Sequence, residues 1–199
     1  MKLYYVPGAC SLGPHIIANE AGLDVELNKV TFGAQRTTAD GRNFYDINPQ
    51  GAVPALELDS GEVLTEAQVL LQYLASLKPE AKLAITDGFD RWRFLETLNF
   101  IATELHKGTS PLFRKPNEEV AAATKANLAN RYKLLEQKLG DKDYLLGQFT
   151  VADAYAYVVI NWARGFEVSL PAKINAYFER MRARPAVQKT LQEEGLPTA

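Results

Sequence analysis

The spacing of apolar residues changes character near residue 88. Before it, short apolar runs are separated by turn residues and by two helical stretches. After it, apolar positions recur every three or four residues through to the end of the chain. Short bounded runs are typical of strands, and the three-to-four spacing is typical of amphipathic helices. The pattern therefore predicts a mixed α/β segment followed by an all-helical one.

The first segment predicts a βαβ unit followed by a ββα unit. A strand at 2–6 leads into a helix that begins near Ser11 and ends at Gly22, and a second strand follows at 25–30. Because a helix connects these two strands, we expect them to be parallel. After a polar loop and a short helical piece come two further elements and a second helix: a strand at 52–58, an antiparallel strand at 62–64, and a helix opened by the capping-box pattern Thr65-x-x-Gln68.

The second segment predicts helices only. Residues 78–87 contain Pro79 and several charges without apolar periodicity, which indicates a linker. The predicted helices are 89–113, 118–139, 151–164, 172–183 and 186–193. Thr150 and Asp153 form a cap signal before the most apolar of them, which we expect at the centre. The expected domains are 1–77, the linker 78–87, and 88–199.

Composition excludes several classes of protein. The 199 residues are 47% hydrophobic and 23% charged, with a net charge of −2 and no basic block, so no nucleic-acid partner is expected. No apolar stretch is long enough for a membrane and the start has no signal-peptide core, which favours a cytoplasmic protein. One cysteine and two histidines supply a metal site poorly, and we expect none.

The single cysteine stands in a turn that opens the first helix. Pro14 fits only the first turn of that helix, which places Cys10 at its N-terminal mouth. Unpaired N–H groups and the helix dipole there favour a thiolate, so Cys10 is a candidate nucleophile; the alternative is a small buried apolar residue. Ser11 could offer its hydroxyl to the sulfur or cap the helix.

Two further stretches suggest binding groups. Pro54 near the start of a strand indicates a bend in the chain. A cis Val53–Pro54 bond would leave the Val53 backbone able to pair with a ligand. The alternative is an ordinary edge strand. On the helix 89–113, an apolar stripe and a polar stripe run side by side. The apolar stripe is Leu95, Leu98, Ala102 and Leu105, and the polar stripe, which could instead face water, is Asn99, Thr103 and His106.

Taken together, these motifs resemble the glutathione transferases over the whole chain, and in detail the bacterial beta class. The motifs are Tyr5-x-Pro-Gly-Ala-Cys-Ser-Leu12, Pro14-His-Ile16, Asn48-Pro49, Gly51-x-Val-Pro-Ala-Leu56, Leu64-Thr-Glu66, Leu98-Asn-x-Ile-Ala-Thr-Glu-Leu-His-Lys-Gly108 and Phe149-Thr-Val-Ala-Asp153. The resemblance implies a thioredoxin-like βαβ-ββα domain followed by an all-helical domain that contributes the electrophile site.

The resemblance also implies a glutathione site. Glu66 would pair with the γ-glutamyl ammonium and free N–H groups at the start of its helix, Ala67 included, would hold a carboxylate. The Val53 backbone, beside Pro54, would pair with the cysteinyl part of glutathione. Relatives often carry a lysine at position 35, so Gln35 predicts a weaker hold on the glycyl carboxylate, and Arg36 is a candidate to compensate. The remaining implied contacts are Asn99, Thr103, Glu104, His106 and Lys107.

The implied activity is conjugation of glutathione, a co-substrate and not a cofactor, to a hydrophobic electrophile in detoxification. His106 would donate a hydrogen bond to the sulfur or relay a proton, and Cys10 could form a mixed disulfide with glutathione. Phe113, Tyr157 and Trp162 are candidates for the electrophile pocket, and a homodimer is expected from the family. The alternatives are a glutathione-dependent thiol–disulfide oxidoreductase or peroxidase, a reductive dehalogenase, and a non-catalytic carrier of apolar ligands.

Overall fold

A computed structural model describes residues 1–198 of the chain. These residues form two compact units. The first consists of Met1–Leu83 together with the residues from Pro185 onward, and the second is Ala84–Arg184. The final helix therefore groups with the mixed α/β unit and not with the helices that precede it, which the hydrophobic pattern did not predict. The predicted fold class, a thioredoxin-like domain and then a helical one, is confirmed.

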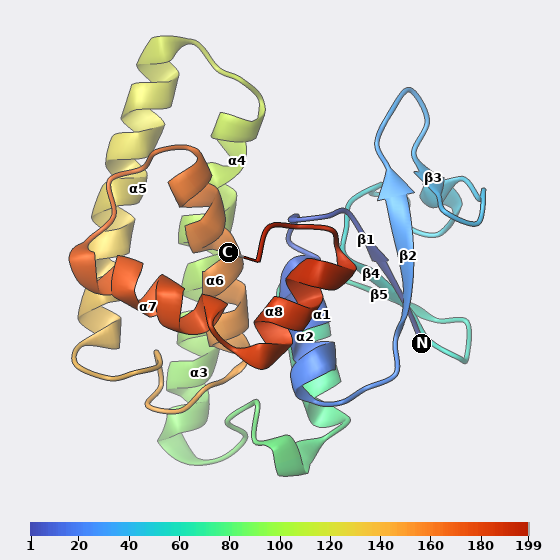
Figure 1. Ribbon diagram of the computed structural model, residues 1–199, viewed down its shortest axis with the longest axis horizontal. Coiled ribbons are helices and arrows are strands. Elements are labelled where there is room, and N and C mark those ends of the chain that lie inside the picture. Colours follow the sequence, from blue (N-terminus) through green and yellow to red (C-terminus); the bar gives the residue numbers. More distant parts are fainter. Residues whose placement is uncertain (199) are drawn as a thin grey trace. The chain divides into compact units, whose positions relative to one another are not determined.

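The first unit is built on a five-stranded mixed sheet with the order β3-β2-β1-β4-β5 (Figure 1). β1 (Lys2–Tyr5) pairs in parallel with β2 (Glu26–Thr31), as predicted. On its other side β1 pairs antiparallel with β4 (Ala55–Glu57), and β4 pairs with β5 (Val63–Thr65). The pattern missed β3 (Thr37–Thr38), because a strand this short leaves no periodicity to read.

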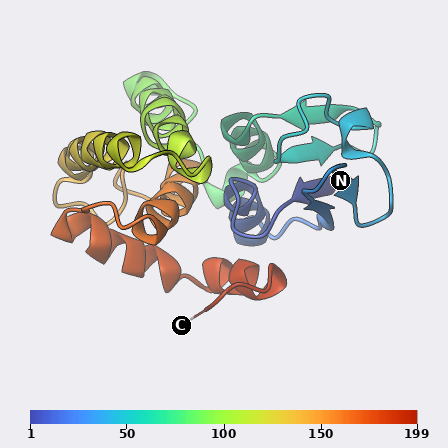
Figure 2. The ribbon, with the colours of Figure 1, turned by 90° about the horizontal axis from the view of Figure 1, so that it is seen from above.

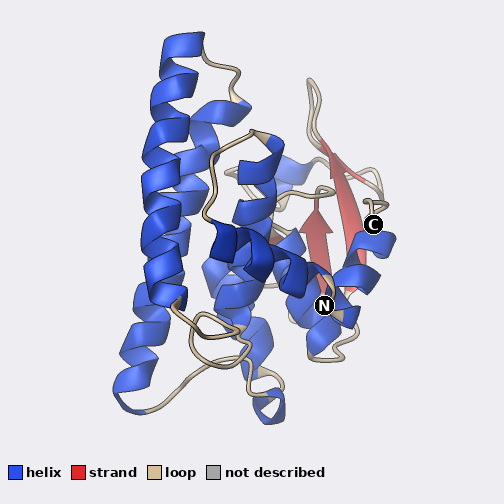
Figure 3. Cartoon of the chain, turned by 60° about the vertical axis from the view of Figure 1, so that its left-hand side comes forward, coloured by secondary structure: helices blue, strands red, loops and turns tan. Residues whose placement is uncertain are grey.

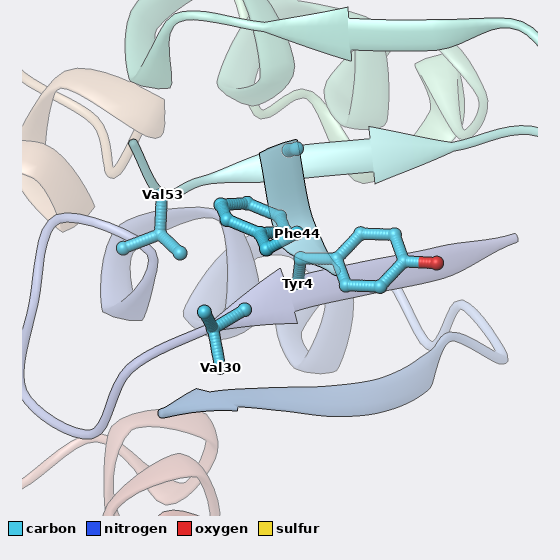
Figure 4. Close-up of a cluster of buried hydrophobic side chains, with 5 residues drawn as sticks. Tyr4, Val30, Phe44 and Val53 are labelled. Atoms are coloured by element: carbon cyan, nitrogen blue, oxygen red, sulfur yellow. The ribbon is translucent and has the colours of Figure 1, made fainter. Parts of the chain in front are cut away.

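Helices α1 (Leu12–Glu20) and α2 (Ala67–Ser76) cover one face of this sheet, as Figure 2 shows. Alternation along β1 sends Leu3 to one face and Tyr4 to the other. Tyr4 packs in a buried cluster on the face away from the helices, with Val30, Val53, Ala55 and Phe44 (Figure 4). Phe44 comes from the short helix η1 (Phe44–Asp46), so this loop segment closes the second face of the sheet.

The first unit also contains α8 (Pro185–Glu193), which packs beside α1 (Figures 1 and 2). Buried His15 of α1 contacts two carboxylates at the end of this helix: its Nε2 lies 2.8 Å from Glu193 and its Nδ1 lies 2.9 Å from Glu194. Asn19 adds hydrogen bonds to Thr190 and Glu193. These polar contacts explain why the last helix belongs to the first unit.

The described part of the second unit consists of helices and loops, with no strand (Figure 3). Its helical elements are α3 (Gly88–Phe100), the π-helical segment η3 (Ile101–His106), α4 (Lys107–Phe113), α5 (Glu118–Leu139), α6 (Val151–Gly165) and α7 (Ala172–Arg182). The predicted cap of α6 is present: Thr150 and Asp153 exchange hydrogen bonds at the start of this helix. Most of α6 is buried, which confirms its predicted central place.

The predicted single helix at 89–113 is interrupted by the π-helical turn. In a π turn the backbone hydrogen bond spans five residues, where that of an α turn spans four. Phe94, Leu98, Ile101 and Leu105 are buried along this stretch, whereas Leu95 and Ala102 of the predicted apolar stripe are only half-buried. That part of the stripe was therefore wrong: the buried positions still recur every three or four residues, but they lie one residue before Leu95 and Ala102, at Phe94 and Ile101.

Among residues 1–198, no helix combines the length and apolar character needed to cross a membrane. The same residues contain no group of three or more histidine, cysteine or carboxylate side chains that could hold a metal ion.

Candidate functional site

The turn before α1 places Cys10 next to the end of the Val53–Pro54 segment. Gly8, with φ +72°, lets the chain reverse after Pro7, and the turn continues through hydrogen bonds from Ala9 to Val6 and from Leu12 to Ala9. The half-buried Cys10 sulfur donates to the Val53 carbonyl oxygen at 3.0 Å. The two motifs singled out in the sequence thus meet within the first unit.

Burial, together with a smaller effect from the negative charge of Glu66, raises the pKa of the Cys10 thiol to about 12. The N–H groups of Cys10 and Ser11 lower this pKa, which is the helix-mouth effect expected from the sequence. That effect is too small to compensate for the loss of hydration, and only the protonated thiol can donate to Val53. The expectation of a thiolate at Cys10 is therefore wrong for the unliganded protein.

Ser11 serves the turn and neither of the two roles expected for it. Its side chain is fully buried, and its hydroxyl oxygen lies 3.2 Å from both the N–H and the carbonyl oxygen of Val6. It makes no capping hydrogen bond to α1. The hydroxyl therefore holds the end of β1 against the start of the helix, and its hydrogen-bonding capacity is used there.

The Val53–Pro54 peptide bond is cis, and Pro54 is buried immediately before β4. The Val53 carbonyl oxygen accepts the Cys10 thiol. Within residues 1–198, the Val53 N–H has no hydrogen-bond partner. Because buried backbone donors are nearly always satisfied, this N–H is suited to a ligand that brings an acceptor.

The start of α2 presents a second set of donors. Glu66 adopts φ +69°, an uncommon conformation for a residue with a side chain, and its exposed carboxylate makes no capping hydrogen bond. The predicted capping box is absent, because β5 continues through Thr65 and Glu66 takes the N-cap position instead. The first helical N–H groups, those of Ala67 and Gln68, have no partner within the described residues and can receive an anion.

Gln35 and Arg36 lie on the loop that follows β2. Gln35 is exposed. The guanidinium group of Arg36 donates to the Gly51 carbonyl oxygen and lies 4.2 Å from the centre of the Phe32 ring. A cation is therefore held close to the segment that leads into Val53, although position 35 itself brings no charge.

In the second unit, the predicted polar residues have different surroundings. Asn99, Thr103 and Lys107 are exposed, and the Thr103 hydroxyl donates to the Asn99 carbonyl oxygen at 3.0 Å. Glu104 instead forms an ion pair with Arg131 of α5, at 2.9 Å. The carboxylate of Glu104 is thus occupied by a neighbouring helix, unlike the side chains of the exposed residues.

His106 ends the π-helical segment, a kind of distortion that is frequent at functional sites. Burial, with a smaller effect from the Lys107 charge, lowers the pKa of its imidazole to about 4. His106 is therefore neutral at pH 7, which disfavours a proton relay near neutral pH and leaves it able to donate one hydrogen bond. Its Nδ1 lies 2.6 Å from the hydroxyl oxygen of Tyr155.

An aromatic cluster surrounds this imidazole. Trp162 meets the His106 ring edge to face, with ring centres 4.9 Å apart, and Phe113 contacts both Trp162 and Phe166. Phe113 is 53% exposed, so the cluster reaches the surface of the unit. Tyr157, the third aromatic candidate from the sequence, is instead stacked on Phe178 in the core.

Sequence reasoning missed Phe166, Tyr155 and Glu194. The Glu194 carboxylate is fully buried, accepts the Gly8 N–H at 2.9 Å and contacts His15, so it fixes the turn that carries Cys10. A separation of 186 residues between Glu194 and Gly8 leaves no local signal for this contact. Tyr155 lies within a nearly continuous apolar run, where a tyrosine indicates core packing.

Comparison with known proteins identifies the family. Residues 8–77 match the model of the glutathione S-transferase N-terminal domain, and residues 100–185 match that of the C-terminal domain. Glutathione S-transferase GstA of Escherichia coli O157:H7 is 42% identical over 98% of this chain and 100% of its own length.

Solved structures agree with this assignment. A sphingomonad glutathione S-transferase complexed with glutathione has a TM-score of 0.91 and 42% identity, covering 99% of this chain and 100% of that one. A bacterial beta class glutathione S-transferase of Sphingomonas chungbukensis has a TM-score of 0.90 and 39% identity, with the same coverage. The resemblance inferred from the sequence motifs is confirmed: the chain belongs to the glutathione S-transferase family.

Proposed function

We propose that the first unit binds glutathione along the Val53–Pro54 segment and the start of α2. The protein then conjugates the sulfur of glutathione to hydrophobic electrophiles. The observation that carries this proposal is the set of backbone donors without protein partners, the N–H groups of Val53, Ala67 and Gln68. An extended peptide with an anionic end needs donors of this kind, as in strand addition and helix N-terminal anion binding. The sphingomonad relative, which was solved with glutathione, supports the choice of ligand.

Each charged group of glutathione has a proposed partner. Glu66 receives the γ-glutamyl ammonium, and the helix N–H groups beside it receive the neighbouring carboxylate. At the glycyl carboxylate, Gln35 supplies no charge, and the nearby guanidinium of Arg36 is the available cation. Ser11 holds the turn in place and does not take part in the chemistry.

The second unit supplies the remaining groups. We assign His106, as a neutral hydrogen-bond donor, to the anionic sulfur or to charge that develops on the electrophile, and the exposed Asn99, Thr103 and Lys107 to glutathione contacts. Glu104 acts through its ion pair with Arg131, which holds η3 against α5. His106, Phe113, Trp162 and Phe166 form the apolar surface for the electrophile.

Titration calorimetry with glutathione tests the binding half of the proposal. Glu66→Gln removes the charge that pairs with the ammonium, and we expect affinity to fall about tenfold, the size of a charge-assisted hydrogen bond. Glu62→Gln is the matched control, because it removes another carboxylate, on the hairpin before β5. This variant should bind glutathione as tightly as the unaltered protein does. Equal loss in both variants, or none in Glu66→Gln, contradicts the assignment.

Cys10 carries the second half of the proposal, a mixed disulfide with glutathione. In that exchange the Cys10 thiolate attacks one sulfur of oxidised glutathione, the Cys10–glutathione disulfide forms, and one glutathione thiolate leaves. Intact-mass measurement after exposure to oxidised glutathione should show a gain of one glutathione that reductant removes. Cys10→Ala should show no gain.

The same variant separates conjugation from redox function. If Cys10→Ala keeps aryl-halide conjugation, the cysteine is dispensable for transfer, and loss of disulfide reduction in this variant would assign that activity to Cys10. Binding of apolar ligands without turnover on any electrophile would instead favour a carrier. The homodimer and the cytoplasmic location expected from the family remain part of the proposal, and sedimentation velocity tests the dimer.

A further inference from the structure

Two side chains of α6 hold the imidazole of His106. Tyr155 is almost fully buried and places its hydroxyl oxygen 2.6 Å from Nδ1. Trp162, seven residues later and so on the same face of the helix, packs edge to face against the same ring at 69°. The ring of Tyr155 itself meets the imidazole at 88°. These contacts restrict rotation of the His106 side chain from more than one direction.

The chemistry of the two polar groups decides the direction of their hydrogen bond. A neutral imidazole has one nitrogen that donates and one that accepts, and the partner of one nitrogen fixes the role of the other. A phenol O–H is a strong donor, because the ring withdraws electron density from its oxygen, and the unprotonated imidazole nitrogen is a strong acceptor. The favoured arrangement is therefore Tyr155 donating to Nδ1, with the imidazole proton on Nε2.

We propose that Tyr155 is a positioning residue, which fixes His106 as the tautomer protonated on Nε2 and so makes this nitrogen a hydrogen-bond donor and not a base. The inference rests on the proposed role of His106 and decides between the two roles considered for it. A donor held in place stabilises negative charge on sulfur or on the electrophile without reorganisation during the reaction. Burial, which keeps the imidazole uncharged at neutral pH, agrees with this role.

Nitrogen-15 NMR measures the tautomer directly. The chain contains two histidines, so His106→Gln identifies the His106 signals by their disappearance. At pH 7.5 the long-range proton–nitrogen correlations should show the proton of His106 on Nε2. Tyr155→Phe should give a mixture of both tautomers, and kcat for conjugation should fall about threefold to tenfold, the value of one hydrogen bond, with KM for glutathione changed less than twofold.

Tyr132→Phe is the matched control. Tyr132 of α5 is also buried and donates to the Val159 carbonyl oxygen of α6 at 2.8 Å, but within the described residues no hydrogen bond or ring contact joins it to His106. Both variants lose one interhelical hydroxyl, so a merely structural effect lowers Tm in both. Only Tyr155→Phe should change the tautomer.

Two results would overturn the inference: a His106 proton on Nδ1 in the unaltered protein, or an unchanged tautomer in Tyr155→Phe. The first of these needs no variant and applies even if Tyr155→Phe fails to fold. The proposed role of His106 is tested separately, because full conjugation activity in His106→Gln would remove that role while leaving the tautomer result standing.

Discussion

Raising the pH tests how far burial suppresses ionisation of the Cys10 thiol. An ordinary thiol pKa of 9.0 becomes about 12 at this position, because the desolvated sulfur outweighs the helix-mouth N–H groups. Three pH units correspond to about a thousandfold less thiolate at any pH below 9. Since the thiolate is the reactive form, alkylation of the folded, unliganded protein should be slower than that of its unfolded chain by about this factor at pH 8.

The assay is labelling with iodoacetamide followed by measurement of the intact mass. Because Cys10 is the only cysteine in the chain, the gain in mass reports alkylation at this one position. The folded protein should react tenfold faster for each pH unit, with the increase continuing past pH 9, whereas the chain unfolded in urea should level off there. Glu66→Gln removes a nearby negative charge and should speed the folded reaction modestly. A folded rate within tenfold of the unfolded rate at pH 8, or levelling at or below pH 9, refutes the reasoning.

The same ionisation controls the proposed mixed disulfide. Because thiolate attack is required, its formation with oxidised glutathione should also accelerate about tenfold per pH unit between pH 7 and 9. The raised pKa of Cys10 also makes the stability of the fold depend on pH. The folded state retains the proton that the unfolded chain loses above pH 9, so this contribution to stability is complete below pH 9 and is lost as the pH rises toward 12.

Three further predictions concern other parts of the molecule. Gln35→Lys should lower KM for glutathione about two- to fivefold through one exposed charge pair, and a neutral Gln35→Met control should not; steady-state kinetics measures both. The NMR signals of the His106 ring should titrate near pH 4 and not near 6.5, and a titration midpoint above 6 would contradict the effect of burial. The stability gained from keeping this ring neutral should be lost as the pH falls from 6.5 through 4. His15→Ala removes the imidazole that contacts the fully buried carboxylate of Glu194, and it should lower the free energy of unfolding by about 3–5 kcal/mol. The side chain of Glu193 is 35% exposed, so Glu193→Gln should lower it by only about 1 kcal/mol. Urea unfolding measures both values. Similar losses in the two would show that the burial of Glu194 does not matter.

Local sequence signals determined most elements of the fold. Short apolar runs placed β1, β2, β4 and β5, and the helical spacing placed the helices of the second unit to within a few residues. Thr150 and Asp153 marked the start of α6 correctly, because a capping box is formed within four consecutive residues. The motifs singled out Cys10 and Val53 separately, but the contact between them was not predicted, because 43 residues separate the two in the chain.

Tertiary structure decided the features that depend on burial or on distant partners. The pKa of Cys10 is set by the atoms that exclude water from its sulfur, and these are invisible in the local motif. The link from Glu194 to Gly8 and His15 joins opposite ends of the chain. The tautomer proposed for His106 depends on Tyr155, which comes from another helix. A sequence therefore specifies hydrogen-bonding groups and their local spacing, whereas their solvation and distant partners arise only when the chain packs.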